Sequence, residues 1–125
     1  MKRTVHAENA PKPLGAYSQA VKAGKFLFVS GQLGIDPKTG KIVADGVTEQ
    51  TRRALENIKA ILAAEDCSLN DVVQTNVYLS STELFSDFNS EYSKYFSTDP
   101  PARVTVGVEL GIGALVEISV IAYAE

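Results

Sequence analysis

Pro100-Pro101-Ala102-Arg103-Val104-Thr105-Val106 predicts an extended segment that enters a β-strand. Each proline removes a backbone donor and fixes φ, so the chain cannot be helical at this point. From Arg103 the residues alternate with the period of a strand, and we expect the valine face (Val104, Val106 and Val108) to lie in the core. The other face begins with Arg103, whose planar guanidinium can bind a carboxylate through two parallel hydrogen bonds.

Length and composition predict one domain, residues 1–125. The net charge of -3, without a basic patch, argues against a nucleic-acid partner. Cys67 is the only cysteine, and no signal peptide or membrane-spanning run is visible, so a cytoplasmic protein is expected. His6 is the only histidine and lies far from Cys67 in the sequence, so neither a metal site nor a catalytic triad is expected.

Periodicity and turn residues predict an α+β fold with a mixed sheet and two helices packed on one face. A capping residue at Thr48 and a capping-box pattern at Ser80 mark the two helix starts. The expected elements are strands at 2–8, 17–23, 26–32, 72–79, 103–110 and 115–123, and helices at 48–66 and from Ser80 to about 96.

The last two strands flank Gly111-Ile112-Gly113, and we expect them to pair as an antiparallel hairpin. The sheet face away from the helices is expected to carry a mixture of polar and apolar residues that suits a subunit interface with a pocket. These residues are Arg103, Thr105, Glu117, Ser119 and Ile121. Spacing leaves two interpretations of Arg103 and Glu117 open, an interfacial ion-pair network or a ligand site.

Eight short motifs occur in order along the chain. They are Glu8-Asn9-Ala10-Pro11, Gly15-Ala16-Tyr17-Ser18-Gln19-Ala20, Phe28-Val29-Ser30-Gly31-Gln32, Asp36-Pro37-Lys38-Thr39-Gly40, Gln50-Thr51-Arg52 before Leu55-Glu56-Asn57-Ile58, Asp87-Phe88-Asn89 with Tyr92, Pro101-Ala102-Arg103, and Val116-Glu117-Ile118. With these motifs the chain resembles the Rid family of YjgF-like enamine/imine deaminases, essentially from end to end.

The resemblance implies a chorismate-mutase-like fold with a six-stranded sheet, and a homotrimer whose sheets form a central barrel. It also implies a cleft at each subunit interface and no cofactor. The reaction would be hydrolysis of 2-imino acids, such as 2-iminobutanoate and 2-iminopropanoate, to 2-keto acids and ammonia. Arg103 would hold the substrate carboxylate, Glu117 would handle the water or proton, and Tyr17 would close the pocket. Ser30, Gly31, Asn89 and Thr105 would contact the ligand.

Three departures from the family pattern stand out. The last hairpin is one residue shorter, Thr105 replaces a frequent cysteine, and Ser119 replaces a frequent acid. Val104, Ile121 and Leu33 are candidate apolar walls that would favour a short aliphatic substrate tail.

Three alternatives to a deaminase remain. The first is a trimer that binds small carboxylates without turnover. The second is an RNA-cleaving or translation-inhibiting protein, and the third is a chaperone of the holdase type. The deaminase is the function that we expect.

Overall fold

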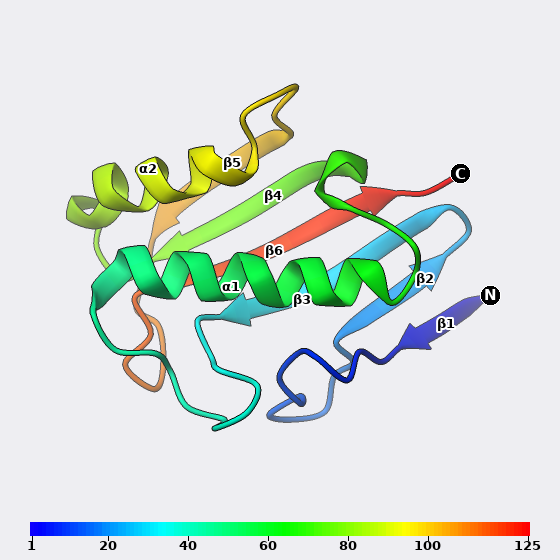
Figure 1. Cartoon of the computed structure of the whole chain (residues 1–125), viewed down its shortest axis with the longest axis horizontal. Coiled ribbons are helices and arrows are strands. Elements are labelled where there is room, and N and C mark those ends of the chain that lie inside the picture. Colours follow the sequence, from blue (N-terminus) through cyan, green and yellow to red (C-terminus); the bar gives the residue numbers. More distant parts are fainter.

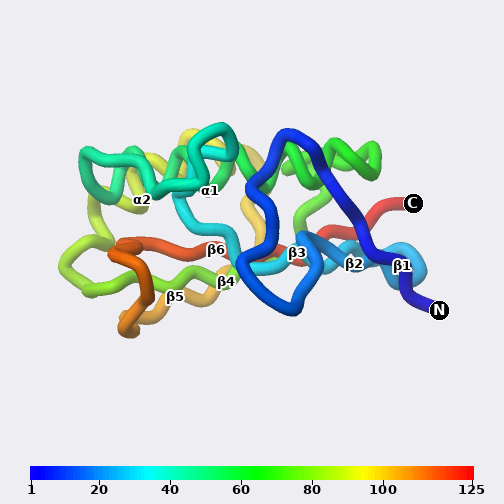
Figure 2. Tube along the Cα trace, turned by 90° about the horizontal axis from the view of Figure 1, so that it is seen from below, coloured from blue at the N-terminus to red at the C-terminus, as the bar shows by residue number.

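Two helices cover one face of a six-stranded sheet, and the other face carries no helix (Figure 1; Figure 2). The computed structural model describes residues 1–125. The strands are β1 (Lys2–Val5), β2 (Ala20–Ala23), β3 (Phe26–Leu33), β4 (Val72–Leu79), β5 (Ala102–Gly107) and β6 (Val116–Tyr123). The helices are α1 (Gly46–Ala63) and α2 (Phe85–Tyr95), with short 3-10 helices at Leu69–Asp71 and Thr82–Leu84. The predicted α+β architecture with a mixed sheet is confirmed.

The strands follow the order β1-β2-β3-β6-β4-β5. β2 and β3 pair as an antiparallel hairpin, but β5 and β6 do not pair with each other. β5 runs parallel to β4 at the sheet edge, whereas β6 lies antiparallel between β3 and β4. The predicted last hairpin is therefore wrong, because alternation along a strand does not identify the strand beside it.

Apolar residues of α1 and β6 form the centre of the core. Leu55, Ile58, Ile61 and Leu62 of α1 are completely buried, and their helical spacing places them on one face of the helix. Burial of each such side chain contributes about 1.5–3 kcal/mol. Val116, Ile118 and Val120 of β6 are also buried, because the helices cover this face of the strand, and β6 lies inside the sheet between β3 and β4.

Both helices begin at residues other than those predicted. α1 starts at Gly46 after Asp45, which has a left-handed φ of 76°, so Thr48 is not the cap. The chain turns into α2 through the 3-10 helix Thr82–Leu84. Here Ser81, not Ser80, accepts the capping hydrogen bond, from the backbone N–H of Glu83 at 3.2 Å. Neighbouring serines have equal capping chemistry, and only the path of the chain selects one of them.

The two faces of β5 are reversed relative to the prediction: the side chains expected on the helix-free face of the sheet lie on the helix-covered face. Its register pairs Arg103 with Thr75 and Thr105 with Val77, two residues that point into the helix-covered core. Arg103 and Thr105 therefore lie on the helix face, and the prediction that they share a face with Glu117 is wrong. Val104 and its neighbouring valines on the same side are 41–53% exposed rather than in the core. At an edge strand, the valine face can remain uncovered within one chain.

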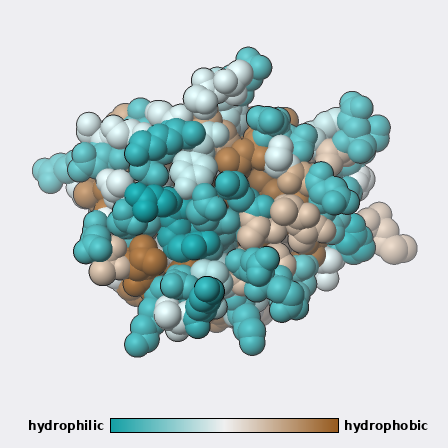
Figure 3. Space-filling view, viewed as in Figure 1, coloured by the Kyte–Doolittle hydropathy of each residue, from teal (hydrophilic) through white to brown (hydrophobic).

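The sheet face opposite the helices exposes several large apolar side chains. Phe28 is 45% exposed and Val104 is 53% exposed. Val73 is exposed too. In a regular strand it would share a face with buried Thr75, but the β4–β6 register shifts between Val72 and Gln74. The helix-covered face in Figure 3 is largely hydrophilic, with scattered hydrophobic patches. An uncovered apolar sheet face is typical of a surface that meets another protein chain.

Neither α1 nor α2 is both long enough and apolar enough to cross a membrane. No group of three or more His, Cys, Asp or Glu side chains is arranged to hold a metal ion. The single cysteine, Cys67, is buried.

Candidate functional site

Arg103 lies against an aromatic surface formed by α2. Its guanidinium carbon is 4.8 Å from the ring centroid of Tyr92, 5.5 Å from that of Phe85 and 5.8 Å from that of Phe88. One terminal N–H group donates to Oδ1 of Asn89 at 2.8 Å. None of the ion pairs in the chain includes Arg103. Because aromatic faces attract a cation without neutralising it, the guanidinium keeps its charge and free donors for an external anion.

A cavity of about 390 Å³ opens beside this guanidinium, and we call it the arginine pocket. Its lining residues are Asn89, Tyr92, Ser93, Phe96, Pro100, Pro101 and Arg103. Pro100 and Pro101 directly precede β5, and their fixed φ restricts the path by which the chain reaches Arg103.

Thr105 shares the helix face of β5 with Arg103. Its hydroxyl oxygen is buried and has no hydrogen-bond partner within the chain. A buried polar atom without a partner costs about 1–3 kcal/mol, so such atoms call for an explanation. Thr105 lines neither the cavity beside Arg103 nor the cavity beside Glu117, so its contact with a ligand stays a prediction.

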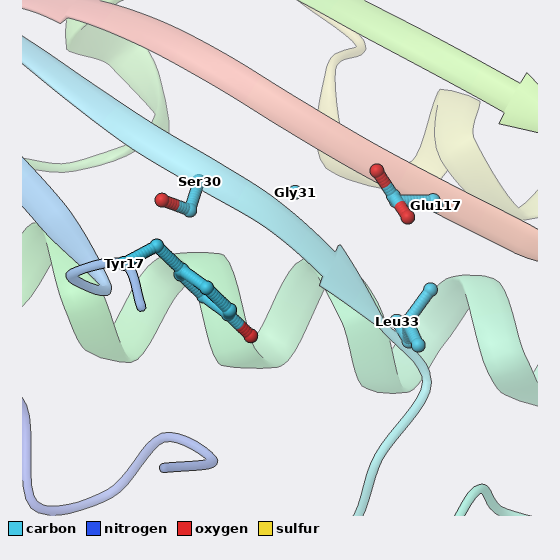
Figure 4. A pocket seen from close by; sticks show the side chains of 5 residues that line it. All are labelled: Tyr17, Ser30, Gly31, Leu33 and Glu117. Atoms are coloured by element: carbon cyan, nitrogen blue, oxygen red, sulfur yellow. The ribbon is translucent and has the colours of Figure 1, made fainter. Parts of the chain in front are cut away.

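A second cavity, of about 330 Å³, lies on the other sheet face, and we call it the glutamate pocket (Figure 4). It is lined by Tyr17, Ser30, Gly31, Leu33 and Glu117. The β3–β6 register shifts between Val29 and Gln32, which places Ser30 and Gly31 in an irregular stretch of β3. Beyond the shift, Leu33 pairs with Glu117 across the two strands.

Glu117 has no cationic partner. No ion pair of the chain contains it, and burial raises the pKa of its carboxyl group. Gly31 leaves the space that this carboxyl group occupies: a methyl group at Gly31 would lie 2.8 Å from the carboxyl carbon. A half-buried carboxyl group whose charged form is disfavoured by burial is suited to accept a proton and return it.

Ser30 and Tyr17 are both held by the chain that precedes β2. The Ser30 hydroxyl donates to the carbonyl oxygen of Ser18 at 2.6 Å, so toward a ligand it can only accept. The phenol oxygen of Tyr17 accepts from the backbone N–H of Leu14 at 3.0 Å, and the ring is about half exposed. Of the three predicted apolar walls, Leu33 lines this pocket, whereas Val104 and Ile121 line neither pocket.

The two pockets lie on opposite faces of the sheet within one chain. Glu117 alternates with the buried residues Val116 and Ile118 and so points away from the helices. Arg103 points toward α2. A small ligand cannot touch both side chains of the same copy, because the sheet separates them. A site that uses both requires the arginine pocket of one copy to face the glutamate pocket of another.

The aromatic residues under Arg103 were not predicted as part of the site. The spacing of Phe85, Phe88 and Tyr92 is typical of the core-facing side of a helix; Phe88 is completely buried, whereas Phe85 is 39% exposed. The overlooked signal is Asn89, a predicted site residue that directly follows Phe88 on the same helix. Residues three and four positions apart share a helix face, so Asn89 indicates that Phe85 and Tyr92 lie beside the site.

Comparison with known proteins agrees with the motifs. A family model described as endoribonuclease L-PSP matches residues 7–124. A RutC family protein of Pyrococcus horikoshii is 54% identical, and the match covers 100% of both chains. A 2-iminobutanoate/2-iminopropanoate deaminase of Mus musculus is 39% identical over 98% of this chain and 91% of its own length.

Solved structures with the same fold are also similar in sequence. A putative endoribonuclease from Thermotoga maritima has a TM-score of 0.96 and 48% identity, and the match covers 100% of this chain and 99% of the other. TdcF from E. coli, solved with bound serine, has a TM-score of 0.93 and 34% identity, with 98% and 99% of the two chains covered. The chain therefore belongs to the endoribonuclease L-PSP family, which is the Rid (YjgF-like) family that its motifs resemble.

Proposed function

We propose that this protein hydrolyses 2-imino acids to 2-keto acids and ammonia, as a 2-iminobutanoate/2-iminopropanoate deaminase that acts between copies of the chain. The observation that carries the proposal is the pair of unpartnered charged groups. Arg103 is held by rings and an amide but by no acid, and Glu117 is half-buried without a cation. Similarity to a mouse protein named for this activity supports the substrate class. The serine bound to TdcF supports recognition of a small carboxylate.

The catalytic assembly would be a homotrimer whose sheets form a central barrel. Its support is the exposed apolar face of the sheet, where Phe28 and Val106 are 45% and 41% exposed. Contact between such faces would bury these side chains. Because Arg103 lies on the edge strand β5, the trimer would place it beside Glu117 of a neighbouring copy, which one chain cannot do by itself.

Arg103 would bind the substrate carboxylate through charge-assisted hydrogen bonds, which contribute about 1.5–3 kcal/mol each. The Thr105 hydroxyl would donate a further bond, and Asn89 would keep the guanidinium oriented. This arrangement fixes the position of the adjacent C=N carbon, on which the reaction takes place.

Glu117 would then serve as the proton carrier. It takes a proton from a water molecule as the oxygen attacks the protonated imine carbon, which gives a neutral carbinolamine. It returns this proton to the nitrogen, the C–N bond breaks, and the hydroxyl proton passes through Glu117 to the departing ammonia. The net change is iminium plus water to 2-keto acid plus ammonium, and a positioned acid–base group contributes about 10²–10⁴ to the rate.

The test is hydrolysis of 2-iminobutanoate formed in situ by an amino-acid oxidase, with 2-ketobutanoate binding measured in parallel. Arg103→Ala is expected to lose at least about 10²-fold in kcat/KM. Arg53→Ala, at an arginine outside both pockets, is the control and is expected to match the wild type. Glu117→Gln should bind 2-ketobutanoate but lose turnover. Wild-type protein that binds the keto acid without accelerating hydrolysis would refute the enzyme in favour of a carboxylate-binding function.

A further inference from the structure

We propose that Thr75 is a positioning residue for Arg103, which acts through a buried hydrogen bond to Tyr92. The inference rests on the proposed function, because it assigns Thr75 to the affinity of the site for the substrate carboxylate. Thr75 lines neither pocket, and no motif in the sequence pointed to it.

The hydrogen bond joins β4 to α2 inside the core. Thr75 Oγ1 and the phenol oxygen of Tyr92 are 2.8 Å apart, and Thr75 and Tyr92 are 0% and 4% exposed. Across the sheet, Thr75 is the direct register partner of Arg103 on parallel strand β5. The paired strands β4 and β5 therefore carry both parts of the contact: Arg103 extends from β5, and Thr75 of β4 binds the Tyr92 ring on which the guanidinium packs.

Tyr92 is the closest aromatic neighbour of the guanidinium. Its ring centroid lies 4.8 Å from the guanidinium carbon and packs between Phe88 and Phe96 at centroid distances of 5.3 and 4.7 Å. A ring in such a stack can still slide or tilt, and the hydrogen bond to Thr75 ties its far end to the sheet. Burial raises the pKa of the Tyr92 phenol, so the group remains neutral and does not form an ion pair with Arg103.

Arg103 depends on this ring because it has few other restraints. Asn89 accepts one hydrogen bond from the guanidinium, and the other close neighbours are the aromatic side chains of Phe85, Phe88 and Tyr92. A bidentate bond to a carboxylate requires a fixed guanidinium plane. If the Tyr92 ring shifts, that plane shifts, while Glu117 on another part of the sheet is unaffected.

The variants are Thr75→Val, which removes the hydroxyl at nearly constant shape, and Thr75→Ser, which retains it. Thr75→Val is expected to raise both the KM for the imine and the Kd for 2-ketobutanoate about 10-fold. The kcat and its pH profile should stay within about twofold of the wild type, because they report Glu117. Thr75→Ser should restore the affinity. In a Tyr92→Phe background, Thr75→Val should have no further effect on affinity.

Thr51→Val is the matched control. Thr51 is also completely buried, but its hydroxyl has no hydrogen-bond partner, so its loss should leave KM unchanged. Equal losses of affinity in Thr51→Val and Thr75→Val would overturn the inference, because a general loosening of the core would then explain both. Independent, additive effects of Thr75→Val and Tyr92→Phe would overturn it as well.

The Nε–H resonance of Arg103 separates this inference from the proposed function. The Tyr92 ring current shifts that resonance, so Thr75→Val should move it and Thr75→Ser should restore it, whether or not the protein is an enzyme. If the wild type has no turnover but the Arg103 resonance moves in Thr75→Val and returns in Thr75→Ser, only the proposed deaminase activity is refuted. An unchanged resonance in Thr75→Val refutes the positioning role of Thr75.

Discussion

Replacement of Gly31 by alanine tests whether the placement of Glu117 limits the reaction. The backbone of Gly31 is not in the left-handed region, so alanine fits its φ. The added methyl carbon would, however, lie 2.8 Å from the carboxyl carbon of Glu117, where ordinary contacts begin at 3.4 Å. The carboxyl group ends a flexible side chain and has to retreat by about 0.6 Å or more, which is within reach of rotation.

A displacement of about 1 Å in a reacting group costs about 10²-fold in rate, so we expect Gly31→Ala to lower kcat by about 10- to 100-fold. Thermal stability should change little, since an alanine in a strand recovers about 0.5–1 kcal/mol of chain entropy relative to glycine. The assay is hydrolysis of 2-iminobutanoate, together with the Kd of 2-ketobutanoate. Gly111→Ala is the matched control, because Gly111 has neither a positive φ nor any neighbour within 4 Å of the added carbon.

The double variant Gly31→Ala/Glu117→Gln decides between displacement of the carboxyl group and simple obstruction of the pocket. If the methyl group acts through Glu117, it should cost little more once the carboxylate is gone. Full activity in Gly31→Ala, or additive losses in the double variant, would refute the reasoning.

Two further predictions concern pH and assembly. Burial raises the pKa of Glu117 above its unfolded value, so this group favours folding at acid pH, and that contribution is lost as pH rises through the folded pKa. Glu117→Gln should therefore melt above the wild type at pH 7 but not below about pH 4, and equal differences at both pH values would contradict this cause. Val106→Glu, on the exposed sheet face, should dissociate the proposed trimer in light scattering and abolish turnover, and it should leave the circular dichroism spectrum of the fold unchanged. An active monomer would disprove the shared site.

Local elements were largely predictable from local pattern. β4 occupies residues 72–79 as predicted, and the stripe of α1 is buried as its spacing indicates. These features depend on contacts within one turn or along one strand, which periodicity reports directly. The bulge at Ser30 and Gly31 was not predicted, because an extra residue in a strand depends on the partner strand.

The sequence by itself determined the element types, the family and the identities of Arg103 and Glu117 as candidates. Only the tertiary structure decided that these two side chains lie on opposite faces of the sheet. The physical reason is register: β5 pairs in parallel with β4, which aligns Arg103 with buried Thr75, while β6 inserts between β3 and β4 and points Glu117 the other way. Strand pairing joins residues distant in the chain, and no local alternation specifies which face of an edge strand the helices will cover.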